Sequence, residues 1–274
     1  MNKDQVRTIL NQRGMNVRKK YGQNFLIDKN MVDKILRTSM VGTDDVVVEI
    51  GPGLGALTVG LAARAKRVIA YEIDAGLSAY LTEQFLGSNH VDIFQQDILD
   101  VTLSFPEPIK VVSNLPYYIT TPILFKLLEG NQEIRSITLM MQKEVAERLV
   151  ATPRTKQYNA LSVILQYLAE VKIEFFVPKT CFYPVPDVDS AVLTIALKQQ
   201  SNHNDTVPFI QFVKYAFHQR RKTMLNNLTS MYHWKKSSVE IVLEQQGFSP
   251  SVRAEELYLT EFIQLYEVLT KTEK

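Results

Sequence analysis

Five short runs of mainly β-branched residues, spaced by longer segments with helical periodicity, constrain the fold of this chain more than any other feature. The runs lie in its middle, at residues 46–50, 67–72, 91–95, 110–114 and 136–141. Such alternation is typical of βαβ units, which build a mainly parallel sheet. The run Val46-Val47-Val48 shows no alternation of apolar and polar side chains, as expected for a strand that is covered on both faces.

Helices are predicted between and beside these strands. The periodic segments lie at residues 28–40, 57–65, 75–86, 121–129 and 143–150, and Asp28 is the expected N-cap of the first. Two further strands, at 172–177 and 190–197, are separated by a proline-rich turn, so we expect them to form an antiparallel pair at one edge of the sheet. The prediction is an α/β fold with a Rossmann-like sheet of seven strands, mostly parallel with an antiparallel edge.

After residue 198 the strand signal disappears. Residues 199–208, QQSNHNDTVP, are polar and predict a loop, and helical segments follow at 209–217, 220–231, 238–246 and 260–271. The chain is therefore predicted to form two domains, an α/β domain over residues 1–198 and a small all-α domain over residues 199–274.

Composition excludes several classes of protein. The 274 residues are 46% hydrophobic and 22% charged, which is ordinary for a globular protein, and no apolar run approaches the roughly 18 residues of a membrane span. The one cysteine, Cys181, excludes an internal disulfide bond and a thiolate cluster for zinc, so no metal is expected. The N-terminal segment shows no apolar secretion signal, and a cytoplasmic location is expected.

Basic side chains cluster near both ends, although the net charge is only +2. Five basic and no acidic residues lie between Arg7 and Lys20, and six basic and no acidic residues lie between Lys214 and Lys236. Either cluster alone is typical of a solvated surface. Two clusters that flank an acidic middle favour a polyanionic partner.

The first strand runs into a glycine-rich turn, Glu49-Ile50-Gly51-Pro52-Gly53-Leu54-Gly55-Ala56. Glycines let the backbone pass close beneath a bound nucleoside, although a tight turn between a strand and a helix has the same composition. Glu72 ends the second strand 21 residues after Gly51, where a carboxylate accepts hydrogen bonds from ribose hydroxyls. Both a dinucleotide and S-adenosylmethionine fit this spacing.

The ends of the third and fourth strands favour S-adenosylmethionine. Asp97 is placed to accept from an adenine amino group, although an Asp at a strand end is more often a turn cap. The tetrad Asn114-Leu115-Pro116-Tyr117 combines an amide, a proline without an N–H group and an aromatic ring. The Asn114 side chain and the Leu115 carbonyl are suited to accept the two hydrogens of an exocyclic amine, and Tyr117 offers a face for the base.

With these features the chain resembles the dimethyladenosine transferases, the small-subunit ribosomal RNA adenine N6,N6-dimethylases, over nearly its whole length. The motifs that carry the resemblance, in the order and spacing of the family, are Gln23-Asn24-Phe25-Leu26, the turn from Gly51 to Thr58, Tyr71-Glu72-Ile73-Asp74, Gln96-Asp97, the tetrad, and the segment from Phe182 to Ala191. One departure is Tyr118, where many members carry Asn.

The resemblance implies a fold, a reaction and roles for individual residues. The fold is a class I S-adenosylmethionine-dependent methyltransferase domain followed by a helical RNA-binding domain. The reaction is dimethylation of N6 on two adjacent adenosines in a 16S rRNA loop, in ribosome small-subunit biogenesis. The implied cofactor-binding residues are Asn24, Leu26, Gly51, Glu72, Asp97 and Asn114, and the implied catalytic residues are Asn114, Leu115, Tyr117 and Phe182.

The implied partner is rRNA within the small ribosomal subunit or its precursor. The protein itself is expected to be a monomer that does not associate with a membrane. The candidate contacts to RNA phosphates are Arg220, Arg221 and Lys222 on a predicted helix, with Arg18, Lys19 and Lys20 from the other end. Adenine would be stacked between Tyr117 and Phe182.

Three other functions fit part of the sequence. A 23S rRNA adenine methylase of the macrolide-resistance type shares the turn, the tetrad and the aromatic residues, but often has Ile at the position of Leu115. A non-catalytic RNA-binding assembly or transcription factor of this fold would not need Glu72, Asp97, Asn114 and Tyr117. A nicotinamide-dependent dehydrogenase would leave the tetrad without a role.

Overall fold

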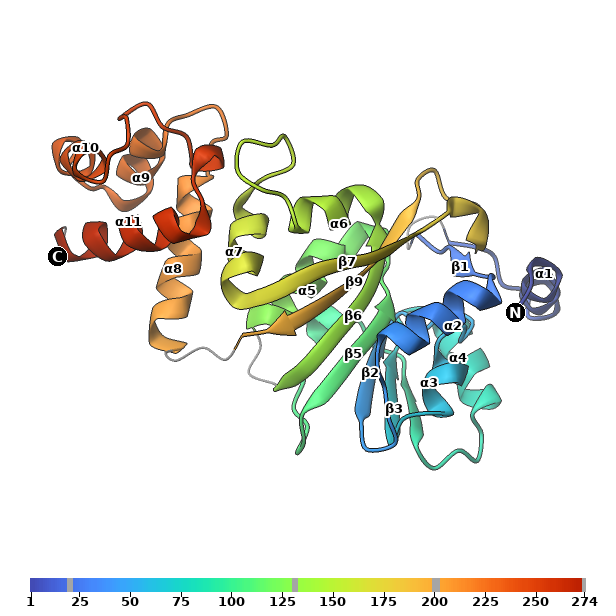
Figure 1. Ribbon diagram of the computed structural model, residues 1–274. Coiled ribbons are helices and arrows are strands. Elements are labelled where there is room, and N and C mark those ends of the chain that lie inside the picture. The colour runs from blue at the N-terminus through green and yellow to red at the C-terminus, as the bar shows by residue number, and fades with distance from the viewer. Residues whose placement is uncertain (19–21, 130–132, 199–202, 273–274) are drawn as a thin grey trace. The chain divides into compact units, whose positions relative to one another are not determined.

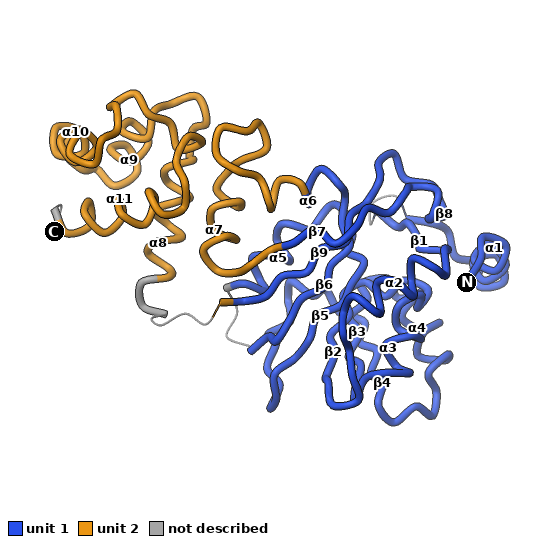
Figure 2. Tube along the Cα trace, in the orientation of Figure 1, with its two compact units in different colours: residues 1–146, 172–197 blue, residues 147–171, 198–274 orange. Residues whose placement is uncertain are grey.

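The computed structural model describes residues 1–18, 22–129, 133–198 and 203–272 (Figure 1). Backbone contacts divide them into two compact units, which we describe one at a time (Figure 2). The first unit contains residues 1–146 and 172–197, and the second contains residues 147–171 and 198–274. The domain boundary predicted near residue 198 remains a prediction. The contact division adds that residues 147–171 group with the C-terminal helices.

The first unit is built on a seven-stranded sheet with the strand order β4-β3-β2-β5-β6-β9-β7. The strands are β2 (Val46–Ile50), β3 (Arg67–Tyr71), β4 (Val91–Phe94), β5 (Ile109–Asn114), β6 (Ile134–Gln142), β7 (Ala169–Val177) and β9 (Ser190–Leu197). The pairs from β4 through β6 are parallel, β9 is antiparallel to β6, and β7 lies at the edge beside β9. The predicted mainly parallel sheet with an antiparallel strand near one edge is confirmed.

Helices connect these strands near the predicted positions. They are α2 (Lys29–Thr38), α3 (Thr58–Ala62), α4 (Ala75–Gln84), α5 (Thr120–Glu129) and α6 (Lys143–Leu149). Asp28 caps α2 by accepting a hydrogen bond from the Met31 N–H at 3.0 Å, as predicted. An apolar cluster joins Ile35 and Leu36 of α2 to residues of the sheet such as Val47. This packing covers one face of the sheet with α2.

Three elements of the first unit were not predicted. Helix α1 (Lys3–Gln12) buries Val6 and Leu10 in a second apolar cluster. The short strands β1 (Phe25–Leu26) and β8 (Phe182–Tyr183) form an antiparallel ribbon. The Ile27 N–H extends this ribbon by donating to the Cys181 carbonyl at 2.8 Å. The ribbon therefore joins the segment of Asn24 and Leu26 to the distant proline-rich segment, with Leu26 paired to Phe182.

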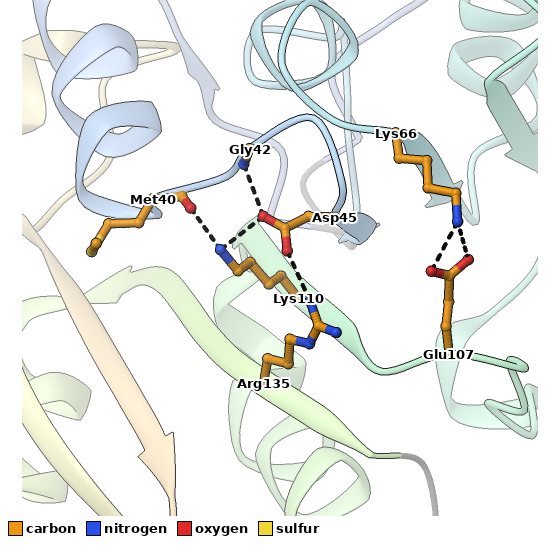
Figure 3. A network of polar contacts seen from close by, with 7 residues as sticks. All are labelled: Met40, Gly42, Asp45, Lys66, Glu107, Lys110 and Arg135. Carbon is orange, nitrogen blue, oxygen red and sulfur yellow. Dashed lines mark hydrogen bonds and ion pairs between the residues drawn. The ribbon is translucent and has the colours of Figure 1, made fainter.

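A polar network centred on Asp45 lies where the parallel strands begin (Figure 3). Asp45 accepts a hydrogen bond from the Gly42 N–H at 2.8 Å and pairs with the Lys110 ammonium at 2.8 Å. Arg135 lies 3.6 Å from its other oxygen, and Lys110 also donates to the Met40 carbonyl at 2.6 Å. The network thus fastens the loop before β2 to β5 and β6.

The second unit consists of helices, α7 (Ala160–Leu168), α8 (His203–Ala216), α9 (Met224–Tyr232), α10 (Lys236–Gln245) and α11 (Leu259–Thr272), with the start of β7. Helix α7 was not predicted. Helix α8 begins at His203, so the loop predicted over 199–208 is wrong from residue 203 onward. None of the helices in the described parts of the chain is long and apolar enough to cross a membrane.

Helix α9 begins later than predicted, and this changes the setting of the basic cluster. Thr223 is its N-cap and accepts a hydrogen bond from the Asn226 N–H at 3.2 Å. The Asn227 amide donates to the carbonyls of Ala216 at 2.7 Å and Gln219 at 3.2 Å, which holds the preceding turn out of the helix. The prediction that residues 220–222 lie on a helix is therefore wrong. They lie in the loop between α8 and α9.

Candidate active site

The glycine-rich turn after β2 brings three distant segments together. Gly51 and Gly53 have φ angles of +66° and +60°, which side chains disfavour. A Cβ atom on Gly51 would lie 3.3 Å from Cγ of Pro116, and one on Gly53 would lie 3.3 Å from the Phe25 ring. Glycine is required here because the turn packs against the tetrad on one side and against β1 on the other.

A cavity opens at this meeting point, at the carboxyl ends of the parallel strands. All six predicted cofactor residues line it, namely Asn24, Leu26, Gly51, Glu72, Asp97 and Asn114. Leu115 and Tyr117 of the tetrad line it as well. The structure thus gathers residues from β1, the glycine turn and the ends of β3, β4 and β5, which is where open α/β sheets bind their ligands.

Glu72 is held rigidly in this cavity. Its side chain is buried, one carboxylate oxygen accepts from the Gly53 N–H at 3.0 Å, and the other accepts from the Asp74 N–H at 2.9 Å. Burial raises the pKa of this carboxyl, and the backbone donors act against the rise. A carboxylate fixed in this way has lone pairs left for a pair of vicinal hydroxyls.

Asp97 caps a turn, as an Asp at a strand end often does, and it also lines the cavity. One of its oxygens accepts from the Leu99 N–H at 2.9 Å and caps the 3-10 turn Ile98–Asp100. The cap uses one oxygen of the carboxylate, and the neighbouring Ile98 lines the cavity beside it. Asp97 can therefore cap the turn and contact a ligand at the same time.

The side-chain oxygen of Asn114 is a hydrogen-bond acceptor to which no described residue donates. This Oδ1 atom is fully buried. Leaving a buried polar atom unpaired costs roughly 1–3 kcal/mol, so such atoms in native proteins require an explanation. The next residue is fixed by the sheet, because the Leu115 N–H donates to the Met140 carbonyl at 2.9 Å. The free acceptor therefore sits on a rigid strand end at the cavity wall.

The structure does not bring Phe182 to this cavity. Its side chain is only 1% exposed and belongs to the apolar cluster with Leu26 and Ile35, and it is absent from the cavity lining. Tyr117 does line the cavity, and its hydroxyl contacts the Ser190 hydroxyl at 2.7 Å. The predicted stacking of adenine between Tyr117 and Phe182 is not preformed in this structure.

Glu49 is a residue of the cavity that the sequence analysis missed. Its side chain is 2% exposed, its Oε2 atom has no hydrogen-bond partner among the described residues, and it lines the cavity. Burial is the main cause that raises its pKa to about 8; the nearby Thr58 hydroxyl opposes the rise and the charge of Glu72 adds to it. The only signal in the sequence was its place directly before the glycine turn.

Three of the predicted RNA contacts, Arg220, Arg221 and Lys222, belong to the second unit. Arg220 is held within that unit, with its Nε atom 3.2 Å from a Glu255 oxygen and its Nη2 atom donating to the Lys156 carbonyl at 2.5 Å. Arg221 and Lys222 are exposed. Arg18 pairs with Asp74 at 3.2 Å, and the remaining two candidates, Lys19 and Lys20, lie outside the described residues.

The cavity fits S-adenosylmethionine. The glycine turn provides a cradle that a Cβ atom would narrow, Glu72 offers acceptors for ribose hydroxyls, and Asp97 with Ile98 provides an acceptor beside an apolar surface for an adenine ring. The buried acceptor of Asn114 lies in the same cavity, where an amino group of a second substrate would be received.

Known proteins resemble this chain over nearly its full length. The family model for ribosomal RNA adenine dimethylase matches residues 14–271. A Lactiplantibacillus plantarum protein named ribosomal RNA small subunit methyltransferase A is 41% identical, over 98% of this chain and 95% of that protein. A protein of the same name from Bacillus pumilus is 42% identical, over 99% of both chains.

Two solved structures are similar in fold. A dimethyladenosine transferase from Plasmodium falciparum has a TM-score of 0.76 and 24% identity, and covers 90% of this chain and 98% of its own. The 23S rRNA methyltransferase ErmE has a TM-score of 0.70 and 28% identity, and covers 90% of this chain and all of its own. Sequence, fold and cavity agree, and the chain belongs to the ribosomal RNA adenine dimethylase family of S-adenosylmethionine-dependent methyltransferases.

Proposed function

We propose that this enzyme dimethylates N6 of two adjacent adenosines in a loop of 16S rRNA, as a step in the biogenesis of the small ribosomal subunit. The observation that carries the proposal is the buried, unpartnered Oδ1 atom of Asn114 at the cavity wall. Relatives at 41–42% identity are named for the small subunit, whereas the 23S rRNA methyltransferase ErmE is 28% identical. These values favour the small subunit as the source of the substrate.

The proposed chemistry rests on orientation. The exocyclic amine of adenine is a poor nucleophile because its lone pair is delocalised into the ring. Asn114 Oδ1 and the Leu115 carbonyl accept its two hydrogens and direct the lone pair away from them. S-adenosylmethionine supplies a methyl group that its sulfonium already activates. The protein then contributes alignment, which is worth several orders of magnitude in rate.

No general base is assigned. Among the described residues that line the cavity there is no His, Lys or Arg. The proton leaves to solvent once the nitrogen has become tetrahedral. Because the amine is held by two acceptors and no covalent bond, the monomethylated product can turn and enter a second round.

Tyr117 is the proposed stacking face for the target base. Phe182 is the proposed second face, and because it is buried in the apolar cluster, this role requires β8 to shift when the base enters. Phe182→Leu keeps an apolar side chain in the cluster and removes the ring. If the ring stacks on adenine, this variant methylates RNA more slowly and keeps its cofactor affinity.

The proposed partner is the small subunit or its precursor, with Arg221 and Lys222 contacting phosphates and Arg220 contributing through its exposed edge. We propose that the enzyme acts as a monomer in the cytoplasm. Shape, and the reach of loop adenines to the cavity, would select the target, since side chains cannot read the deep groove of an RNA helix.

The test is incubation of the protein with labelled S-adenosylmethionine and both ribosomal subunits from a strain that lacks this activity, followed by mass spectrometry of the 16S and 23S rRNA. Two dimethylated adenosines in one 16S loop are the expected result. Label in 23S rRNA alone would assign the macrolide-resistance type of activity. Cofactor binding by calorimetry without any transfer would indicate a non-catalytic RNA-binding factor.

A further inference from the structure

A single hydrogen bond ties the tetrad to the start of β9. The hydroxyls of Tyr117 and Ser190 lie 2.7 Å apart, although the residues are 73 positions apart in the sequence. Ser190 is paired with Gln142 at the end of β6, and Asn114 is paired with Met140 two residues before that end. The contact therefore lies at the same end of the sheet as the free acceptor of Asn114.

A short turn fixes the backbone of Tyr117. The residue opens a 3-10 turn behind Pro116, and the Thr120 hydroxyl donates to the Pro116 carbonyl at 3.1 Å. Two side-chain torsions still set the orientation of the ring. An anchor on the hydroxyl restrains both of them, because it fixes the end of the side chain that is farthest from the backbone.

The anchor is protected from water. Ser190 is completely buried and does not line the cavity, so its hydroxyl is available to Tyr117 and is not positioned to contact the cofactor. Burial also raises the pKa of the Tyr117 phenol, with the Ser190 hydrogen bond acting in the opposite direction, and the phenol stays neutral at physiological pH. Both hydroxyls therefore keep the protons that the bond requires.

We propose that Ser190 is a positioning residue of this methyltransferase, which holds the Tyr117 ring in the orientation that receives the target base. This inference rests on the proposed function, in which Tyr117 stacks on adenine. Ser190 acts through Tyr117 and touches neither the cofactor nor the reacting nitrogen. Without the bond the ring still offers a face, but it samples orientations in which an inserted base is not aligned with the methyl group.

The test is a double-mutant cycle on methyl transfer to 16S rRNA in small subunits, with Ser190→Ala, Tyr117→Phe and the double variant. Each single variant removes the same hydrogen bond, so each is expected to lower kcat/KM by about three- to tenfold. The double variant is expected to match the single variants, because no bond is left to lose. The dissociation constant of S-adenosylmethionine is expected to stay at the wild-type value in all three.

Thr194→Ala is the matched control, because it removes a hydroxyl from the same strand that bonds to Glu174 and not to Tyr117. It should leave kcat/KM at the wild-type value. If Ser190→Ala does not fold, Tyr117→Phe still removes the hydrogen bond, and it is expected to fold because Tyr117 is partly exposed. The kcat/KM of that variant then decides whether the bond matters for methyl transfer.

Two outcomes overturn the inference. One is a double variant whose loss equals the product of two single losses, which would mean that the hydroxyls act independently. The other is an unchanged kcat/KM in a folded Tyr117→Phe variant. Either result, obtained with a wild-type enzyme that dimethylates 16S rRNA, leaves the proposed function standing. A wild-type enzyme that labels no adenosine would instead refute the proposed function, and this inference with it.

Discussion

Three side-chain oxygens are buried and have no hydrogen-bond partner among the described residues. Buried polar atoms in folded proteins normally have such partners. The three oxygens belong to Glu49, Thr58 and Asn114. Two of these residues line the same cavity. Polar groups that are buried without partners destabilise a folded chain, so their concentration around one cavity is explained by the ligands that would satisfy them.

Asn114→Ala tests the acceptor of the target amine. The lone pair of the amine is then no longer aimed at the methyl group, and the rate of transfer is expected to fall on the order of 10²-fold. Affinity for the small subunit should hardly change, since the proposed phosphate contacts are left intact. Single-turnover methylation and filter binding measure the two quantities, and Asn89→Ala, in the exposed loop before β4, is the control. A wild-type rate for Asn114→Ala would show that Asn114 does not orient the target amine and that the tetrad has only a structural role.

Glu72→Ala tests the cofactor end of the cavity. The substitution removes the acceptors for two hydroxyls, each charge-assisted bond contributing roughly 1.5–3 kcal/mol, so S-adenosylmethionine should bind more than tenfold more weakly. Calorimetry gives the dissociation constant, and circular dichroism checks the fold. Glu107→Ala, which removes a carboxylate that pairs with Lys66, should bind as the wild type does. An unchanged constant in folded Glu72→Ala would exclude this residue from the site.

Glu49 makes stability depend on pH. Its pKa is 4.5 in the unfolded chain and about 8 in the folded protein, so the folded state keeps a proton that the unfolded state releases. The free energy of unfolding therefore falls as the pH rises from about 4.5 to about 8, and Glu49→Gln removes this dependence. Urea unfolding should show the Gln variant as the more stable protein at about pH 8, with a smaller difference at about pH 5. Equal differences at both values would contradict the pKa.

At the scale of elements, the positions of the main strands along the chain and most residues of the cavity follow from local patterns, whereas the order of the strands within the sheet does not. Apolar runs placed the strands, and the residues directly after them gave Glu72, Asp97 and Asn114. The pairing of β1 with β8 has no local signature, because each strand is two residues long and its partner is distant in sequence. Helix α1 was missed because its few apolar residues lie among charged ones.

The start of α9 illustrates a competition between propensity and capping. The basic residues before it have good helix propensity, but Thr223 caps the first turn of α9. The Asn227 amide donates to the Ala216 carbonyl and so holds the preceding segment in a loop. Phe182 is a different case. Its aromatic ring suggested stacking, and nothing in its neighbours revealed that β8 pairs with β1 and turns the ring into the apolar cluster.

The loop between α8 and α9 contains one arginine with structural contacts and two basic residues that we propose to contact RNA. Arg221→Glu with Lys222→Glu should weaken binding to small subunits and flatten its salt dependence, because phosphate contacts release counterions. Arg220→Ala should mainly lower the melting temperature, since it breaks the contacts to Glu255 and the Lys156 carbonyl. Cofactor affinity should be unchanged in both. A salt slope equal to that of the wild type in the reversal variant would make the loop an ordinary solvated surface.

At the scale of the whole molecule, stability and activity are assigned to opposite ends of one sheet. The Asp45 network fastens the ends at which the strands begin, and the cavity occupies the ends at which they finish (Figure 3). Substitutions in the network should therefore change unfolding and leave the cofactor affinity as it is.

Asp45→Asn tests that separation. Burial raises the pKa of Asp45, but Lys110, the Gly42 N–H and Arg135 outweigh it, and the net pKa lies below its usual value of 3.8. The carboxylate therefore stabilises the fold above that value, and the contribution is lost as the pH falls through the folded pKa. The variant should lose about 1.5–3 kcal/mol of unfolding free energy near pH 7 and much less near pH 3. A weaker cofactor affinity would show that the two ends are coupled.

The β1–β8 ribbon limits how this chain can change in length. Side chains of a strand alternate between its two faces. One residue inserted before or within either strand would therefore turn the side chains that follow it to the opposite face. Leu26 would leave the cavity wall, and Phe182 would leave the apolar cluster. A proline at position 27 would remove the N–H group that donates to the Cys181 carbonyl. Conservative replacements in these strands should thus be tolerated more readily than insertions and deletions, which would displace residues that line the cavity.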